Sequence, residues 1–264
     1  MIGLAFVGWA LAAGQLAAGQ LAAGSLVEAP RVAVGPGVYR PTYAPTPAEE
    51  KIYVARFLLA TTPVTNSDFA LFVANSPAWR RDRVDPLFAD EGYLGDWAAA
   101  DAPGASVDAS GPVTRVSWFA ARAYCAASGG RLPTEAEWEL AAAASETSWD
   151  ARQDPAFIQQ LLGWYGEPTP KRLPPVGGRP PNRWGARDLH GVVWEWVEDF
   201  NASLMSVDAR DDNSGDDLRF CGAGAANATN AGDYASFMRV ALRSSLEARA
   251  TVRTLGFRCA WSAP

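Results

Sequence analysis

Two long stretches of this chain lack any regular spacing of apolar residues, and they constrain its fold more than any other feature. Residues 77–113 and 146–187 are rich in proline, glycine and aspartate, and several of the chain's 11 tryptophans lie in them. Neither the period of an amphipathic helix nor the alternation of a half-buried strand is sustained there. A domain built from this sequence must therefore assemble much of its core from loops.

The remaining segments predict short strands and helices. Residues 51–60 consist mainly of strand-forming side chains. Residues 61–76 switch to helical spacing and place Phe69, Phe72 and Val73 on one face. We therefore expect a strand followed by a helix at the start of the folded domain.

Capping residues predict two further helices. Ser117 can begin a helix that the glycine pair at 129–130 ends, because glycine adopts the left-handed conformation easily. Thr134 and Glu137 stand in the capping-box relation, which predicts a helix over 135–144. Further strands are predicted over residues 192–198, 237–244 and 254–261. Together these elements describe an irregular α+β domain.

The composition excludes several classes of function. A net charge of −6 argues against nucleic acid as a partner, because binding its backbone requires clustered cations. The only histidine is His190, whereas His₃ zinc sites, two-histidine iron sites and HExxH proteases need at least two imidazoles. His190 itself precedes Gly191 in a turn, where it is either a proton shuttle or a histidine with a structural role.

The N-terminal segment has the pattern of an export signal. Residues 2–24 carry no charge, and an apolar stretch ends in the small residues 22–24. We therefore predict an export signal over residues 1–29 and a periplasmic or secreted protein, with no stable membrane span after signal removal. Basic residues are missing from this segment, and a retained anchor and a cytosolic alanine-rich tail are the alternatives. Gln15 and Gln20 weaken the anchor, which would need about 20 strongly apolar residues.

The predicted domain boundary follows a proline-rich segment. Residues 30–50 contain several prolines and little periodicity, and we interpret them as an extended lead-in. Residues 51–264 then form the domain itself.

Within that domain, several segments resemble the sulfatase-modifying-factor family, which is typified by formylglycine-generating enzymes. The resemblance implies an irregular, loop-rich variant of the C-type-lectin-like fold. The segments follow the family's order and lie at residues 63–73 (PVTNSDFALFV), 112–125, 130–139 (GRLPTEAEWE), 181–196 and 255–260.

The resemblance also carries expectations about copper. Catalytic members of the family convert a substrate cysteine into formylglycine with copper held by two thiolates, which are ligands that copper(I) favours. The matching segment here, residues 222–239, contains no cysteine, and Asn230 and Ala235 stand approximately at the ligand positions. Copper chemistry of that kind is therefore not expected.

A structural disulfide between Cys125 and Cys259 is likewise implied by the resemblance. The chain has one other cysteine, Cys221. One thiol cannot form a two-thiolate site, so this pairing agrees with the loss of copper chemistry.

Calcium is the cofactor that the resemblance predicts, because the family binds it in the loop containing its Trp-Glu-Trp sequence. The matching groups are the carboxylates of Asp188 and Glu195 and the carbonyls of Gly191 and Val193, and oxygen ligands of this kind suit Ca²⁺. The alternative is that Asp188 caps a turn and Glu195 pairs with an arginine. The acidic run at 208–217 lacks the EF-hand spacing and is interpreted as a solvated loop.

Trp194 and Tyr234 match positions that line the family's substrate groove, and Asn230 is a third candidate there. Trp194 has a role in the core as its alternative. Arginines are frequent in the C-terminal quarter, where they either hold loops through buried carboxylates or bind substrate. They are Arg239, Arg243, Arg249, Arg253 and Arg258.

These expectations combine into one leading hypothesis and two alternatives. The leading one is an exported accessory protein that assists the maturation of a periplasmic protein or peptide-derived metabolite. Divergent family members act in siderophore (pyoverdine-type) maturation or accompany copper nitrite reductases, and residues 233–245 resemble the second group. The alternatives are an oxidase with Glu or Tyr as its acid-base group and a lectin-fold binding module without turnover.

Overall fold

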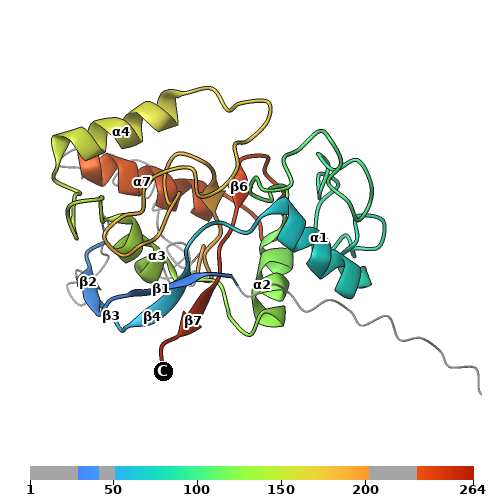
Figure 1. The fold of residues 1–264 in the computed structure, drawn as a ribbon, viewed down its shortest axis with the longest axis horizontal. Helices are drawn as coiled ribbons and strands as arrows, with labels where there is room; N and C mark the ends of the chain where they lie inside the picture. Colours follow the sequence, from blue (N-terminus) through green and yellow to red (C-terminus); the bar gives the residue numbers. More distant parts are fainter. Residues whose placement is uncertain (1–28, 42–50, 202–230) are drawn as a thin grey trace, which may run out of the picture.

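The computed structural model describes residues 29–41, 51–201 and 231–264 (Figure 1). Most of the predicted export signal, Asn230, Cys221 and the acidic run at 208–217 lie outside these ranges. The helices are α1 (Asn66–Asn75), α2 (Trp118–Ala127), α3 (Glu135–Ala142), α4 (Pro155–Gly166) and α7 (Ala231–Ser244), with a 3₁₀ turn, η1, at Pro77–Trp79. The strands are β1 (Arg31–Val34), β2 (Gly37–Tyr39), β3 (Ile52–Val54), β4 (Phe57–Ala60), β5 (Trp194–Glu195), β6 (Leu255–Gly256) and β7 (Ala260–Ser262).

The strands of the described segments form small sheets that join distant parts of the chain. β4 lies between β1 and β7 in an antiparallel sheet, β2 pairs with β3, and the two-residue strands β5 and β6 pair in parallel. β1 and β2 come from the segment interpreted as an extended lead-in, so part of that segment contributes to the sheets. Figure 1 shows α4 and α7 side by side on one flank of the molecule and α1 and α2 on the other.

The three helices predicted from capping residues and spacing are confirmed. Thr65 begins α1 with a capping box, although the helix starts five residues later than the spacing suggested. Ser117 accepts a hydrogen bond from the Ala120 N–H at the start of α2. Thr134 and Glu137 form the predicted capping box of α3. Local side-chain chemistry therefore fixed where these helices begin.

Two predictions of secondary structure were wrong. Residues 237–244 belong to helix α7, not to a strand. The buried face of α7 repeats every four residues through Ala235, Arg239 and Arg243, and a pattern of hydrophobic residues misses a helix whose buried positions are arginines. α4 lies inside the stretch predicted to be loop; Asp154 caps it and Pro155 occupies its first turn, but Leu161 is its only buried residue.

The predicted strands are shorter than expected. Only Trp194–Glu195 of residues 192–198 pairs as a strand. Residues 51–60 divide into β3 and β4, and residues 254–261 divide between β6 and β7. The stretch at 77–113 is irregular beyond η1, as predicted.

Aromatic rings from separate loops and helices fill the core between α1 and α2. Phe69 contacts Tyr124, Trp97 and Phe257 with ring centroids 5.8, 6.2 and 6.1 Å apart. Because large aromatic side chains bury much apolar surface, a few of them can organise loops that have no regular hydrogen bonding of their own.

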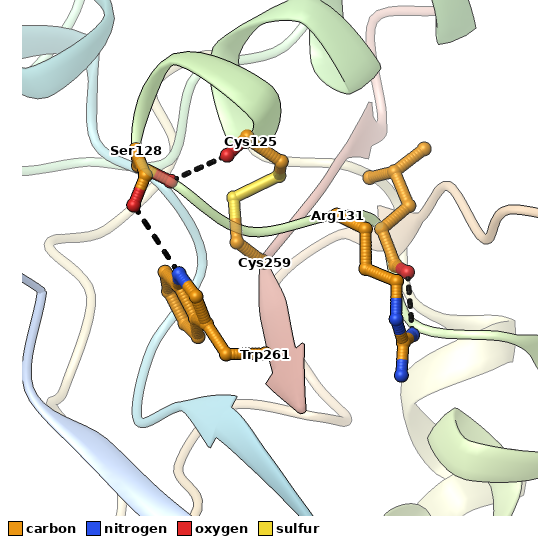
Figure 2. The surroundings of a disulfide bond; sticks show 6 residues. Cys125, Ser128, Arg131, Cys259 and Trp261 are labelled. Carbon is orange, nitrogen blue, oxygen red and sulfur yellow. Dashed lines mark hydrogen bonds between the residues drawn. A yellow bond between two sulfur atoms is a disulfide. The ribbon is translucent and has the colours of Figure 1, made fainter. Parts of the chain in front are cut away.

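The predicted disulfide joins Cys125 on α2 to Cys259 (Figure 2). Beside it, the Ser128 hydroxyl donates to the Cys125 carbonyl at 2.7 Å and the Trp261 indole donates to the Ser128 carbonyl at 3.2 Å. The bond therefore ties the end of α2 to the start of the last strand. No helix within the described residues is both long and apolar enough to cross a membrane.

Candidate functional site

An aromatic pocket of about 270 Å³ opens beside the end of α4. The Trp194 ring lies 5.2 Å from that of Trp164 and 4.9 Å from that of Tyr165, centroid to centroid. We call the pocket formed by these three side chains the aromatic groove. Its other walls include Pro168, Pro170, Pro174, Arg179 and Thr254.

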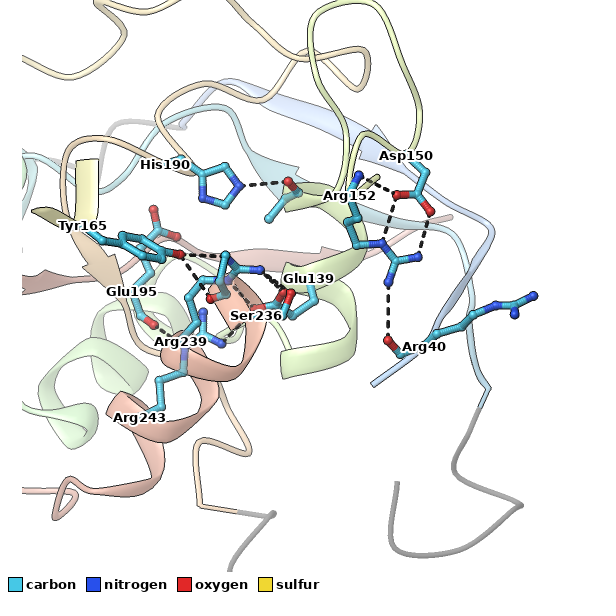
Figure 3. A network of polar contacts seen from close by, with 12 residues as sticks. Arg40, Glu139, Asp150, Arg152, Tyr165, His190, Glu195, Ser236, Arg239 and Arg243 are labelled. Carbon is cyan, nitrogen blue, oxygen red and sulfur yellow. Dashed lines mark hydrogen bonds and ion pairs between the residues drawn. The ribbon is translucent and has the colours of Figure 1, made fainter. Parts of the chain in front are cut away.

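Tyr165 connects the aromatic groove to buried charges (Figure 3). Its hydroxyl accepts from Nη1 of Arg239 at 2.8 Å and donates to the Ala235 carbonyl at 3.3 Å. The same guanidinium donates to both carboxylate oxygens of Glu139, at 2.8 and 2.6 Å. Arg243 adds a contact of 3.4 Å to that carboxylate. Glu139, Arg239 and Arg243 are all buried, so the pair is screened from water.

The charges of this network set the protonation states near the groove. Burial alone would raise the pKa of Glu139, but Arg239 and Arg243 outweigh it and hold that pKa below its ordinary value. Burial raises the pKa of the Tyr165 hydroxyl, although Arg239 opposes the shift. At neutral pH, Glu139 is therefore an anion and Tyr165 a neutral phenol.

A second buried ion pair lies at the Trp-Glu-Trp sequence. Both carboxylate oxygens of Glu195 accept from Arg258 at 2.8 Å, and one also accepts from the Trp138 indole at 2.7 Å. Arg258 further donates to the carbonyls of Ala60, Thr61 and Arg187. The guanidinium of Arg258 thus neutralises the buried carboxylate of Glu195.

Two of the four groups expected to bind calcium make contacts with arginine side chains. Glu195 pairs with Arg258, which is the alternative raised from the sequence. The Gly191 carbonyl accepts from Arg179 at 3.0 Å. One carboxylate oxygen of Asp188 accepts from the Gly177 N–H, while the other has no partner within the described chain. Two of the four groups expected as ligands therefore already face arginine.

His190 has the surroundings of a structural residue. Its Nε2 donates to the Ala142 carbonyl at 2.9 Å, and its ring packs edge-on against Trp138 and Phe157. Burial, reinforced by the positive charge of Arg239, lowers the pKa of His190 to about 3. The ring is therefore neutral at pH 7 and poorly matched to proton transfer there.

The structure brings some of the predicted groove residues together and separates others. Trp194 is half-buried and lines the groove. Tyr234 is 42% exposed and is not among the residues that line it. Asn230 lies outside the described residues. Three of the five C-terminal arginines, Arg239, Arg243 and Arg258, are buried on glutamates, which is the structural role considered for them.

Trp164 and Tyr165 were not predicted to belong to the site. Both lie on α4, within the stretch that was predicted to be loop. A signal was present, because Asp154 and Pro155 form a helix start and Leu161 follows at helical spacing. A helix predicted from Asp154 and Pro155 would have placed Trp164 and Tyr165 near its end.

Comparisons with known proteins agree with the fold. Residues 13–263 match the family model described as sulfatase-modifying factor enzyme 1-like domain. A Mus musculus protein named inactive C-alpha-formylglycine-generating enzyme 2 is 32% identical over 82% of this chain and 78% of its own. A Streptomyces coelicolor formylglycine-generating enzyme is 31% identical over 82% of each chain. The crystal structure of CarF aligns with a TM-score of 0.51 and 16% identity, covering 89% of this chain and 99% of CarF, which shows a shared fold.

Proposed function

This chain belongs to the family of sulfatase-modifying factor enzyme 1-like domains. From this membership we propose that it is an exported accessory protein that assists the maturation of another protein or of a peptide-derived metabolite. The partner binds in the aromatic groove. The observation that carries the proposal is the cluster of the half-buried rings of Trp164, Tyr165 and Trp194 at a pocket, because aromatic side chains give large contact area at little cost in conformational entropy.

The cysteines support a role without copper-thiolate oxidation. The chain has three cysteines, and two of them form the disulfide between Cys125 and Cys259. Only Cys221 is left, whereas the copper site of catalytic family members needs two thiolates. The names of the relatives do not decide the matter, because one is a formylglycine-generating enzyme and another carries the word inactive.

The protonation states beside the groove favour binding over acid-base chemistry. An efficient general acid or base has a pKa near the working pH. The pKa of Glu139 is shifted down and that of Tyr165 is shifted up, so both are displaced away from neutrality. The alternative of an oxidase that uses these residues as its acid-base pair is therefore less well supported than a binding role.

Two partner classes are the first to test. The resemblance of residues 233–245 to proteins that accompany copper nitrite reductases makes such a reductase the first, and a siderophore precursor is the second. In both cases the groove, and not a metal site of this chain, makes the contact.

The test compares a groove variant with a surface control. Tagged wild-type protein, Trp194→Ala and Tyr53→Ala are expressed in the native host, where Tyr53 is 70% exposed and away from the groove lining. The protein or metabolite retained by the wild type and by Tyr53→Ala should be lost with Trp194→Ala. In a strain lacking this protein, the same partner should differ in mass or cofactor content. The mature N-terminus of the purified protein tests export.

Two results would count against the proposal. Equal retention by Trp194→Ala would remove the groove from the contact. A partner that is retained but unchanged in mass and cofactor content in the deletion strain would identify a lectin-fold binding module, not a maturation protein.

A further inference from the structure

A second pocket, of about 370 Å³, lies between strand β2, helix α3 and the two loops that carry Trp149 and Trp184. We call it the Trp149 pocket. Its lining is mostly apolar and includes Pro36, Val38, Leu140, Ala143, Trp149 and Trp184. None of these residues lines the aromatic groove, so the two pockets are separate.

Two apolar side chains of the Trp149 pocket are open to solvent. Val38 is 45% exposed and Trp149 is 50% exposed. The Trp149 ring packs against that of Trp184, with ring centroids 4.4 Å apart. Single exposed apolar side chains are common on protein surfaces, whereas several of them around a hollow are typical of a binding site. Tryptophan is also among the residues that contribute most to the affinity of protein interfaces.

The carboxylates that line the Trp149 pocket are already neutralised by arginines. Asp150 accepts from Nε of Arg152 at 2.9 Å and from Nη2 at 2.7 Å (Figure 3). Glu139 is buried and binds Arg239. No other carboxylate of the described residues lines this pocket. Its negative charges are therefore balanced within the protein.

Unpaired cations lie around the mouth of the pocket. The guanidinium carbon of Arg183 lies 4.6 Å from the centre of the Trp149 ring. Hydrogen bonds from Arg152, aided by the charge of Arg40, hold the pKa of Asp150 below its ordinary value, so Arg40 is close to the pocket as well. Figure 3 shows the Arg40 side chain extending away from the ion pair of Asp150 and Arg152.

Lys51 adds a third cation on this side of the molecule. Tyr39 of β2 pairs with Ile52 of β3, so Lys51 and Arg40 stand at the same end of the two strands. Arg40, Lys51 and Arg183 are all exposed, and none of them forms an ion pair with a carboxylate in the described part of the chain. This face is therefore basic, although the chain as a whole has a net charge of −6.

We propose that the Trp149 pocket docks an acidic segment of a partner protein, which places one apolar side chain beside Trp149 and its carboxylates near the three cations. An apolar centre with a charged rim is the usual anatomy of a protein interface, and opposite charge at the rim guides the partner to it. A lipid surface fits less well, because side chains that enter a bilayer project outward, whereas these line a hollow. This site is separate from the aromatic groove and does not depend on the proposed function.

A displayed library of random peptides tests the proposal without assuming a partner sequence. The library is first depleted on immobilised Trp149→Ala protein and then selected on the wild type, so that peptides bound elsewhere are removed. The enriched peptides should carry aspartate or glutamate beside a leucine, phenylalanine or tryptophan. Melting temperatures of the wild type and of Trp149→Ala show whether the variant is folded.

Charge reversal then measures the contribution of the rim. A fluorescently labelled copy of an enriched peptide is titrated with protein and followed by anisotropy. Arg40→Glu with Lys51→Glu should weaken binding about tenfold or more at low ionic strength, and less at high ionic strength, because exposed charges are screened by salt. The matched control is Lys171→Glu with Arg249→Glu, two exposed cations that do not line the pocket. It should bind the peptide nearly as well as the wild type.

Three results would overturn the proposal. One is a selection that enriches no peptide, or peptides without acidic residues. Another is an affinity that Arg40→Glu with Lys51→Glu leaves unchanged. The third is a dimer of the wild-type protein, detected by sedimentation, that Trp149→Ala dissociates, which would assign the pocket to a second copy of this chain.

Discussion

Two adjacent residues, Arg258 and Cys259, attach the C-terminal segment to different parts of the fold by different means. Cys259 is bonded covalently to Cys125 on α2. Arg258 binds Glu195 and three backbone carbonyls through hydrogen bonds. The disulfide limits the unfolded chain and is indifferent to nearby charge. The ion pair stabilises only while both partners are present and charged.

The largest effect is expected from removing the covalent link. The disulfide joins residues 134 positions apart, and closing a loop of that length corresponds to about 5 kcal/mol in the chain-entropy model. Cys125→Ala with Cys259→Ala should therefore lower the free energy of unfolding by up to about 5 kcal/mol, measured by denaturant titration.

The matched control for that experiment is Cys221→Ala, which also removes a thiol but leaves the disulfide in place. Its unfolding should match that of the wild type, and added reductant should destabilise both. If the double alanine variant unfolds at the same denaturant concentration as the wild type, the covalent link contributes little and the comparison fails.

The second largest effect on stability is expected from breaking the ion pair between Glu195 and Arg258. Glu195→Gln leaves the fully buried Arg258 guanidinium without its counter-charge, which typically lowers the free energy of unfolding by about 3–5 kcal/mol. Thermal and denaturant melts of Glu195→Gln, Arg258→Met and the double variant measure the coupling. The double variant should lose clearly less than the sum of the single variants; strict additivity would show that the two residues act independently.

Glu135 sharpens the comparison, because it is a carboxylate near Arg239 and Arg243 that, unlike Glu195, has no hydrogen bond to an arginine among the described contacts. Burial, with Glu139 and Asp199 nearby, raises the pKa of Glu135 from its ordinary 4.5 to about 7, although Arg243 opposes the shift. Because the pKa of Glu135 is higher in the folded than in the unfolded protein, the contribution of its protonated carboxyl to the free energy of unfolding is fully present below pH 4.5. That contribution is lost as the pH rises through 7.

Glu135→Gln should therefore be more stable than the wild type at pH 8 and equal to it at pH 4. The gain is about 2 kcal/mol, taking about 1.4 kcal/mol for each pH unit between the two pKa values and allowing for the lost charge at a helix N-terminus. Denaturant melts across this range measure it, with the exposed Glu91→Gln as control. A gain that does not vary with pH would contradict the assigned cause.

The smallest effect is expected from a chelator. Because Arg258 and Arg179 already face Glu195 and Gly191, excess EDTA should shift the melting temperature by less than about 1 °C, since a ligand that is not bound stabilises nothing. A clear fall in the melting temperature, reversed by calcium, would instead restore the calcium site that the family resemblance implies.

The fold was predictable where the sequence carries local signals. Ser117 and Thr134 begin helices as predicted because their hydroxyls accept from the first free N–H groups, and this needs no distant partner. Thr65 acts in the same way, but the spacing had placed the start of that helix at residue 61. The disulfide and the irregular stretch at 77–113 also agree with the structure. The disulfide, however, came from the resemblance to a family, because spacing alone does not decide how cysteines pair.

The site was predictable only in part. Trp194 was identified as a groove residue, but Trp164 and Tyr165, which complete the groove, were not. They lie on α4, inside a stretch whose prolines and glycines favoured a loop, and Leu161 is the one buried residue of that helix.

The sequence by itself determined where α2 and α3 begin, that three cysteines are available for cross-linking, and that residues 222–239 contain no cysteine. Only the tertiary structure decided which arginine meets which glutamate, because Arg239 and Glu139 are 100 residues apart and Arg258 and Glu195 are 63 apart. Helix α7 shows the reason most clearly. Its buried face carries Arg239 and Arg243. Arginine is predicted to lie at the surface from sequence alone, and here Arg239 is buried because a carboxylate from another element, that of Glu139, pairs with it.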